Sequence, residues 1–252
     1  MSGDAQSAAG PNAGPAHVAP LPSRLFAEFL GALVLVAAVV GSGIMAQTLS
    51  PDDTGLQLLE NAIATGGVLV VLIAVLGPVS GAHFNPVVTL VDAWFGGIRA
   101  REAAPYIAAQ VLGACLGAVL ANLMFGLAAV SISTHERTGA NLWLSEGVAT
   151  FGLLLLILGL VRGGRSEWIA PSVAAYIVGA YWFTASTSFA NPAVTIGRTL
   201  SDTFAGIAPS SVPGFVAAQL VGAAVAVLAI LLLWPQRSAR QAVAIDVVAE
   251  TR

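Results

Sequence analysis

Six long stretches without a charged residue divide this chain of 252 residues. They lie between Glu28 and Asp52, Glu60 and Asp92, Glu102 and Glu136, Glu146 and Arg162, Glu167 and Arg198, and Asp202 and Arg237. Most of them can hold a membrane-spanning helix, which needs about 20 apolar residues. The fourth stretch is shorter, but its apolar pattern begins earlier, near Leu142. The sequence therefore predicts an all-α membrane protein with six transmembrane helices.

The composition excludes other classes of protein. Apolar residues make up 57% of the chain and charged residues 9%, whereas a soluble domain carries about 25% charged residues. The net charge is −3 and there is no basic block, so nucleic-acid binding is not expected. Cys115 is the single cysteine and cannot form an internal disulfide, and the 3 histidines are scattered along the chain. We therefore expect no metal site.

Two polar tails flank the apolar region. Residues 1–22 are rich in Ala, Gly, Pro and Ser, and they lack the basic start and apolar run of a signal peptide. We predict a disordered tail there, a membrane domain over residues 23–236, and a second tail over residues 237–252.

The arginine distribution predicts the orientation, since the chain contains no lysine. With the N-terminus inside, the inner loops and tails carry Arg24, Arg99, Arg101, Arg162, Arg165, Arg237, Arg240 and Arg252. The outer side then carries only Arg137 and Arg198. This bias follows the positive-inside rule and places both termini in the cytoplasm. The Ala-rich, Arg-only composition favours a bacterial inner membrane.

Two of the uncharged stretches are too long for one helix. The 31 residues between Glu60 and Asp92 would form a straight helix of about 46 Å, longer than a hydrocarbon core of about 30 Å. We expect a break at Gly77-Pro78, and an equivalent break after about Thr184. Irregular backbone at membrane depth survives only inside protein or beside a water-filled cavity. Both segments therefore indicate a pore or a substrate site.

The two halves of the chain are similar. AEFLGALVLVAAVVG and SEGVATFGLLLLILG resemble each other, as do HFNPVVTLVDAWFGGI and FANPAVTIGRTLSDTFAGI, and PYIAAQVLGACLGAVLA and PGFVAAQLVGAAVAVLA. Each unit, over about residues 23–130 and 141–236, has three spans and one broken segment. Because three is odd, the second unit enters from the opposite face, which makes an inverted 3+3 repeat with a site near the midplane.

An Asn-Pro pair opens each broken segment, at Asn85-Pro86 and Asn191-Pro192. Asparagine is a favoured N-cap and proline a favoured first helical residue, so each pair predicts a re-entrant half-helix of eight to ten residues. The two half-helices then meet at the midplane with their positive ends, which oppose cations. If each Asn oxygen caps its own helix, the NH₂ groups are free to donate to a passing hydroxyl oxygen. The permeant should be small, neutral and hydroxylic.

GAHFNPVVT, ANPAVT, Glu28 and Glu146 together resemble the major intrinsic protein family of aquaporins and aquaglyceroporins, over about residues 24–234. The resemblance implies six spans and two half-helices in a right-handed bundle, a homotetramer with a pore in each subunit, and passive conduction without a cofactor. The midplane motifs would be Asn85, Pro86 and Val87, and Asn191, Pro192 and Ala193. Val87 stands where the family usually has alanine.

The second motif departs from the family at Val194, where an arginine normally follows Asn-Pro-Ala and lines the outer constriction. Offsets counted from the asparagines place the other constriction residues at Thr65, Gly179 and Ser188. This filter has no bulky ring, histidine or charge, so we expect it to be wide. It predicts passage of glycerol-like polyols, of trihydroxy arsenic or antimony compounds, and of water. The sequence also resembles bacterial relatives associated with arsenic resistance that lack this arginine.

The resemblance assigns roles to three further residues. Glu28 and Glu146 would brace the Asn-Pro loops by accepting backbone hydrogen bonds, although Glu28 could instead be an interfacial residue beside Arg24. His83 would line the inner part of the path, with a role as a gating proton sensor as the less favoured alternative. Each carboxylate in a membrane helix should face the protein interior.

Arg198 lies one helical turn beyond Val194, on about the same face. It could place a guanidinium in the outer vestibule and partly replace the missing charge. The alternative is an interfacial arginine that reaches lipid headgroups.

Other polar and small residues have predicted structural roles. Gln110 and Gln219 should form interhelical hydrogen bonds, and Gly113 and Gly117 should allow close helix packing within the subunit. Asp92 should be solvated at the cytoplasmic face.

The sequence leaves alternatives to a solute channel. A mainly water-conducting channel is one alternative. A secondary active transporter is another, but it would need titrating groups at the midplane, where only Glu28 and Glu146 are candidates. An enzyme is not expected, because the spacing near Ser80 is not that of a catalytic triad.

Overall fold

The computed structural model describes residues 19–235, and the regular structure of this part is entirely helical. The elements are α1 (Leu21–Leu49), α2 (Thr54–Ser80), α3 (Pro86–Phe95), α4 (Ala100–Met124), α5 (Ala140–Arg162), η1 (Ser166–Trp168), α6 (Ile169–Phe183), α7 (Pro192–Gly197), η2 (Arg198–Leu200), η3 (Pro209–Ser211) and α8 (Val212–Leu233). The predicted tails lie outside the described residues, except that α1 already begins at Leu21.

Five helical segments are long and apolar enough to cross a membrane: α1, α2, α4, α5, and α8 together with the η3 turn before it. Helix α6 has 15 residues, about 22 Å, and is shorter than the other predicted spans. Large apolar side chains remain exposed along the outer helix faces, among them Leu116, Leu120 and Leu123 of α4. Such faces fit a lipid environment, so the predicted all-α membrane fold is confirmed.

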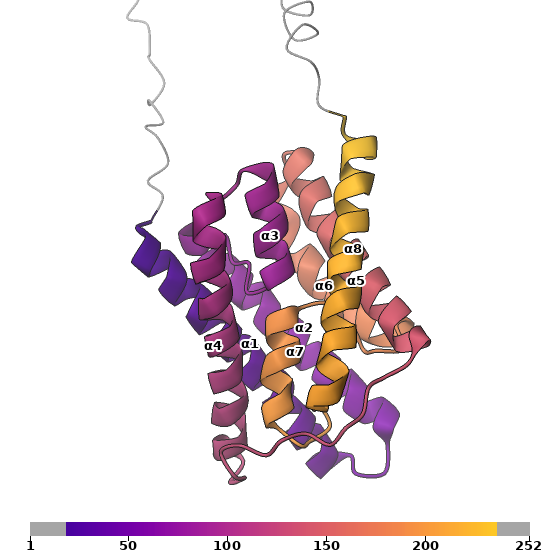
Figure 1. The fold of residues 1–252 in the computed structure, drawn as a ribbon. Coiled ribbons are helices and arrows are strands. Elements are labelled where there is room, and N and C mark those ends of the chain that lie inside the picture. Colours follow the sequence, from indigo (N-terminus) through magenta and orange to yellow (C-terminus); the bar gives the residue numbers. More distant parts are fainter. Residues whose placement is uncertain (1–18, 236–252) are drawn as a thin grey trace, which may run out of the picture.

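The packing follows the two halves of the chain. Helix α1 packs mainly on α4 in the first half, α5 packs on α8 in the second, and α2 contacts α6 between the halves. Figure 1 shows α3 and α7 one above the other in the middle of the bundle, and places both ends of the described chain at the same end of it. The half-helices contact each other, as an inverted repeat requires.

The Gly113 and Gly117 pair sets how closely α4 approaches α1. A Cβ atom added at Gly113 would lie 2.2 Å from the carbonyl oxygen of Phe29, and one at Gly117 would lie 2.2 Å from that of Leu33. Only glycine leaves room for this contact between backbones. The predicted role of this pair in packing within the subunit is confirmed.

The predicted break at Gly77-Pro78 is wrong, because α2 continues through Pro78 and ends at Ser80. Pro78 lies in the last turn of α2. Its missing backbone N–H removes one hydrogen bond there and does not interrupt the helix. Gly81 ends the helix with a φ of 90°, a left-handed conformation that glycine adopts without a steric penalty.

The two half-helices differ in length. Helix α3 has 10 residues, as expected, whereas α7 has 6 and then tightens into the 3 residues of η2. The second half-helix therefore has a shorter α-helical part than the predicted eight to ten residues.

Candidate functional site

Each asparagine of the Asn-Pro pairs caps the half-helix that follows it. The side-chain oxygen of Asn85 accepts a hydrogen bond of 3.1 Å from the backbone N–H of Val87. That of Asn191 accepts from Ala193 at 2.9 Å and from Val194 at 3.3 Å. Pro86 and Pro192 occupy the first helical position, where no backbone donor is needed.

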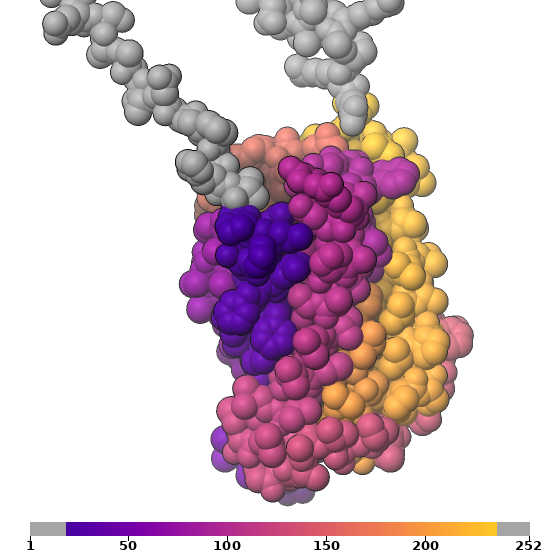
Figure 2. Space-filling view, turned by 60° about the vertical axis from the view of Figure 1, so that its left-hand side comes forward, coloured from indigo at the N-terminus to yellow at the C-terminus, as the bar shows by residue number. Residues whose placement is uncertain are grey.

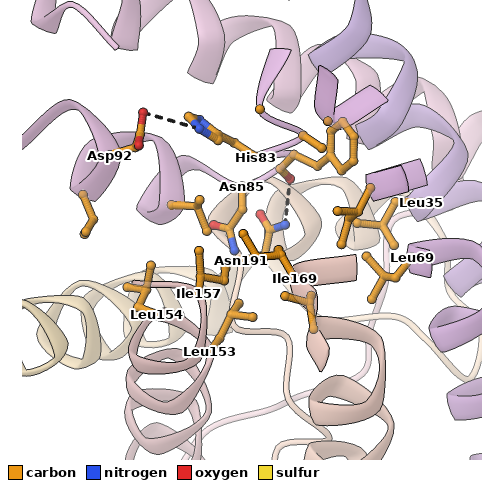
Figure 3. A pocket seen from close by; sticks show the side chains of 18 of the residues that line it. Leu35, Leu69, His83, Asn85, Asp92, Leu153, Leu154, Ile157, Ile169 and Asn191 are labelled. Carbon is orange, nitrogen blue, oxygen red and sulfur yellow. Dashed lines mark hydrogen bonds and ion pairs between the residues drawn. The ribbon is translucent and has the colours of Figure 1, made fainter. Parts of the chain in front are cut away.

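The asparagine side chains also join the two halves of the chain. The Asn85 amide donates to the Ala190 carbonyl oxygen at 2.8 Å, and the Asn191 amide donates to the Phe84 carbonyl oxygen at 2.8 Å. Figure 3 shows the two side chains close together in the pocket. The expectation of an unengaged NH₂ group is therefore wrong, since one hydrogen of each amide is used across the repeat and one remains.

Both loops reach the asparagines through the same unusual backbone conformation. The residues one and three positions before Asn85, Phe84 and Ala82, have φ values of 48° and 50°. Their counterparts before Asn191, Ala190 and Ser188, have φ values of 48° and 52°. A positive φ is costly for residues with a side chain, so the surrounding contacts must hold these loops in place.

Two buried glutamates supply these contacts. Glu28 accepts hydrogen bonds from the backbone N–H groups of His83 at 3.0 Å and Phe84 at 2.7 Å, and from the Ser80 hydroxyl at 2.6 Å. Glu28 is 0% exposed, so it does not lie at the interface beside Arg24.

Glu146 repeats this arrangement in the second half. It accepts from the backbone N–H groups of Phe189 at 2.9 Å and Ala190 at 2.8 Å. The loops that precede the half-helices are thus each anchored to a carboxylate from the first helix of their own repeat, which fixes the direction of their carbonyl groups.

A glutamine and a threonine complete each anchor. Gln110 donates to Glu28 at 2.7 Å and to the Thr89 hydroxyl at 2.8 Å. In the second half, Gln219 donates to Glu146 at 2.7 Å and to the Thr195 hydroxyl at 3.0 Å. The predicted interhelical bonds of the two glutamines are therefore confirmed.

A cavity of about 770 Å³ passes between the two halves, and both asparagines line it. Of the other predicted site residues, Thr65, His83, Ser188, Val194 and Arg198 line it as well. The buried Pro86, Val87, Pro192 and Ala193 lie behind its wall.

Much of the remaining wall is apolar. Leu153, Leu154 and Ile157 of α5 line one side of the cavity near the asparagines (Figure 3). Leu35 of α1 and Leu69 of α2 contribute from elsewhere in the wall. An apolar wall gives a permeating ion no replacement for its hydration shell.

The prediction for Gly179 is wrong. Gly179 is exposed on the outer face of α6 and is absent from the cavity wall, where Tyr181 of the same helix lies instead. The Tyr181 hydroxyl is 3.3 Å from the Thr65 hydroxyl oxygen. The prediction counted back from Asn191 and assumed a fixed number of residues between the cavity wall of α6 and α7. The irregular loop between these helices does not keep that number. A tyrosine in an apolar helix was the sequence feature that could have indicated a residue of the cavity wall.

The end of the cavity near Arg198 combines hydroxyl groups with aromatic rings. The buried Ser188 hydroxyl has no protein partner in the described chain, and the Phe189 ring also lines the cavity. With Thr65 and Tyr181, which also line the cavity, these residues make this end of the cavity more aromatic than the predicted set of Thr65, Gly179, Ser188 and Val194.

Arg198 is buried, with 3% of its surface exposed, and lines the cavity. Its Nε donates to the Ala205 carbonyl oxygen, and its guanidinium carbon is 3.4 Å from the centre of the Phe189 ring. Because the side chain is enclosed by protein, the headgroup-contacting alternative is wrong.

His83 and Asp92 form the opposite end of the cavity. His83 Nε2 is 3.6 Å from a carboxylate oxygen of Asp92, and His83 Nδ1 is 3.1 Å from the Thr89 hydroxyl (Figure 3 shows the first contact). Asp92 was expected to be simply solvated, but it lines the cavity beside the histidine.

Comparison with known proteins places the chain among its relatives. Residues 18–187 match the family model described as "Major intrinsic protein". The chain is 54% identical over 220 residues to "Aquaglyceroporin AqpS" of Rhizobium meliloti, covering 87% of this chain and 93% of that protein. It is 32% identical over 237 residues to "Aquaporin AqpM" of Methanothermobacter marburgensis, covering 82% and 96%.

A similar fold occurs among solved structures. The aquaglyceroporin from Plasmodium falciparum matches with a TM-score of 0.64 at 20% identity, over 82% of this chain and 93% of that one. At this identity, the match bears on the fold alone.

Proposed function

Because the chain belongs to the major intrinsic protein family, we propose that it is a passive transmembrane channel for small neutral hydroxylic solutes and water. The observation that carries this proposal is the pair of asparagine amides that line the cavity. Asn85 and Asn191 each keep one N–H for a solute oxygen, and their other contacts fix both side chains. A solute would replace its hydrogen bonds to water with hydrogen bonds to these donors, and no covalent bond would form.

The shape of a polyol matches the two kinds of wall. A molecule such as glycerol has hydroxyl groups along one edge and C–H groups along the other. The hydroxyls of Thr65 and Tyr181 and the amides of both asparagines would form hydrogen bonds with the polar edge. The leucines and the Phe189 ring would serve the other. An ion would lose its hydration shell without equal compensation.

Two observations support glycerol-like polyols as solutes, and a chemical likeness makes trihydroxy arsenic or antimony compounds further candidates. Val194 leaves the usual arginine position uncharged and short. The relative with 54% identity carries the name aquaglyceroporin. A neutral trihydroxy compound presents the same donor and acceptor groups as a polyol. Water is small enough to follow the same route.

The remaining parts of the proposal concern the setting of the channel. We propose a homotetramer in a bacterial inner membrane with both termini in the cytoplasm, and a channel domain built from repeats over about residues 23–130 and 141–236. The arginine bias supports the orientation, and the matched helix order of the two halves supports the repeats. The relatives are channels, and the proposal assigns no catalytic residue and no cofactor.

Stopped-flow measurements on proteoliposomes that contain the purified protein test this function. Outward gradients of glycerol, urea, arsenous acid and sucrose would be compared with a water gradient. We expect flux of the first three and of water above empty liposomes, and none of sucrose. If only water moved, the protein would be a water channel, and if glycerol accumulated against its gradient when a proton gradient was imposed, it would be an active transporter.

A further inference from the structure

Two arginines contact one aromatic ring at the outer end of the cavity. The guanidinium carbon of Arg198 is 3.4 Å from the centre of the Phe189 ring, and that of Arg137 is 5.2 Å from it. Arg198 follows α7, whereas Arg137 belongs to the connection between α4 and α5. Two separate segments thus bring positive charges together one turn beyond the uncharged Val194.

Backbone carbonyls hold both guanidinium groups. Arg198 Nε donates to Ala205, while Arg137 Nε donates to Gly206 at 2.8 Å and Arg137 Nη2 to Phe204 at 3.2 Å. In the part of the chain that the structure describes, neither arginine forms an ion pair with a carboxylate. Their partners are therefore neutral, and the two positive charges are not cancelled by a direct contact.

The Phe189 ring is itself fixed in place. Its backbone N–H donates to Glu146, and its ring packs edge-on against Phe215 with centres 5.1 Å apart. Phe189 and Arg198 both line the cavity. The two terminal nitrogens of Arg198 have no acceptor in the described chain and are not sealed from accessible space, so they can face the path.

The connection that carries Arg137 is tied to the segment after α7. The backbone N–H of Ser133 donates to Thr199 at 2.8 Å, and that of Ala208 donates to His135 at 2.8 Å. Figure 2 shows this connection running across the lower end of the molecule. Burial lowers the pKa of Arg137 to about 10, which still leaves it protonated at neutral pH.

We propose that Arg137 and Arg198 together form the outer barrier to cations, in place of the filter arginine that is absent at Val194, and that Phe189 is their positioning residue. This inference rests on the proposed function, since it concerns selection at the entrance of the same path. Each fixed charge raises the electrostatic energy of a cation at the constriction and leaves a neutral solute almost unaffected. The α4–α5 connection is then a part of the selectivity machinery.

The test compares cation and glycerol permeability of the full chain in proteoliposomes, with a pH-sensitive dye for protons, methylammonium as a second cation, and stopped-flow glycerol flux. We expect Arg137→Gln and Arg198→Gln each to raise the ratio of cation to glycerol permeability roughly tenfold, as the loss of one unit charge at about 10 Å predicts. The matched control is Arg101→Gln, which removes an exposed arginine at the opposite end and should leave the ratio unchanged.

Three further variants separate charge from folding. Arg137→Lys retains a charge and should keep the ratio near that of the unmodified protein, whereas Phe189→Leu removes the positioning ring and should raise it. Val194→Arg added to Arg198→Gln should return the cation permeability itself to that of the unmodified protein, whatever its effect on glycerol flux.

If Arg137→Gln leaves the ratio of cation to glycerol permeability unchanged, the proposal is overturned. If Arg137→Gln does not fold, the double variant Val194→Arg with Arg198→Gln decides, and a cation permeability that stays high in it overturns the proposal. Absence of glycerol flux in the unmodified protein would instead overturn the proposed function.

Discussion

The side-chain amide of Asn85 donates a hydrogen bond of 2.8 Å to the carbonyl oxygen of Ala190, 105 residues further along the chain. The reciprocal bond, from Asn191 to Phe84, has the same length. Each asparagine thus caps its own half-helix with its oxygen and holds the opposite loop with its nitrogen. The centre of the cavity is built by both repeats together, and neither repeat could form it alone.

Asn191→Asp should separate the two roles of this side chain. A carboxylate still accepts the capping hydrogen bonds from Ala193 and Val194 but cannot donate to Phe84. We expect glycerol flux to fall at least tenfold and the free energy of unfolding to fall by about 1–3 kcal/mol, because a buried acceptor loses its donor. Stopped-flow flux and thermal unfolding in detergent measure the two effects. Glycerol flux equal to that of the unmodified protein would show that the donor is dispensable.

Glu28→Gln should destabilise the first Asn-Pro loop. Glu28 accepts bonds from two backbone N–H groups, from Ser80 and from Gln110, and a glutamine NH₂ would face donors in place of an acceptor. We expect the free energy of unfolding to fall by about 2–4 kcal/mol, since the buried N–H groups lose their partners. Thermal unfolding checks this value. Glu60→Gln, a partly exposed residue on α2, is the matched control and should cost under 1 kcal/mol.

Val194→Arg should narrow the outer constriction. The added side chain would enter the cavity near Thr65 and Tyr181 and take up space that solutes use. We expect flux of glycerol and arsenous acid to fall several-fold while water flux changes less, because water is smaller. The ratio of glycerol to water permeability in proteoliposomes measures this effect. A ratio that stayed the same or rose would contradict the placement of Val194 at the constriction.

Gly117→Leu should prevent α4 from packing on α1, because even a Cβ atom there would lie 2.2 Å from the Leu33 carbonyl oxygen. We expect loss of folded protein or a decrease in the free energy of unfolding of more than about 3 kcal/mol, as overpacking against a backbone cannot relax by a change of rotamer. Gly67→Ala is the matched control, since its Cβ would meet nothing within 4 Å. Size-exclusion profiles and thermal unfolding compare the two variants, and equal stability would refute the packing argument.

The helices, the repeat and the two asparagines were predictable from sequence for local reasons. Charged residues are so costly in a bilayer that their spacing predicts the spans. Asn-Pro is a local helix start, so α3 and α7 begin where the sequence says. The predicted end of α2 was wrong because both Pro78 and Gly81 are residues that can end a helix. The local sequence does not indicate which of the two ends it.

The lining of the cavity near Val194 depended on tertiary structure. The inward position of Tyr181 rather than Gly179 follows from the path of an irregular loop, which no periodicity describes. The pairing of Arg137 with Arg198 joins segments 61 residues apart through backbone carbonyls, which carry no side-chain signature. The sequence by itself therefore determined which segments cross the membrane and which residues start the half-helices. Only the folded chain decided which side chains share the cavity, because that depends on how separate segments pack.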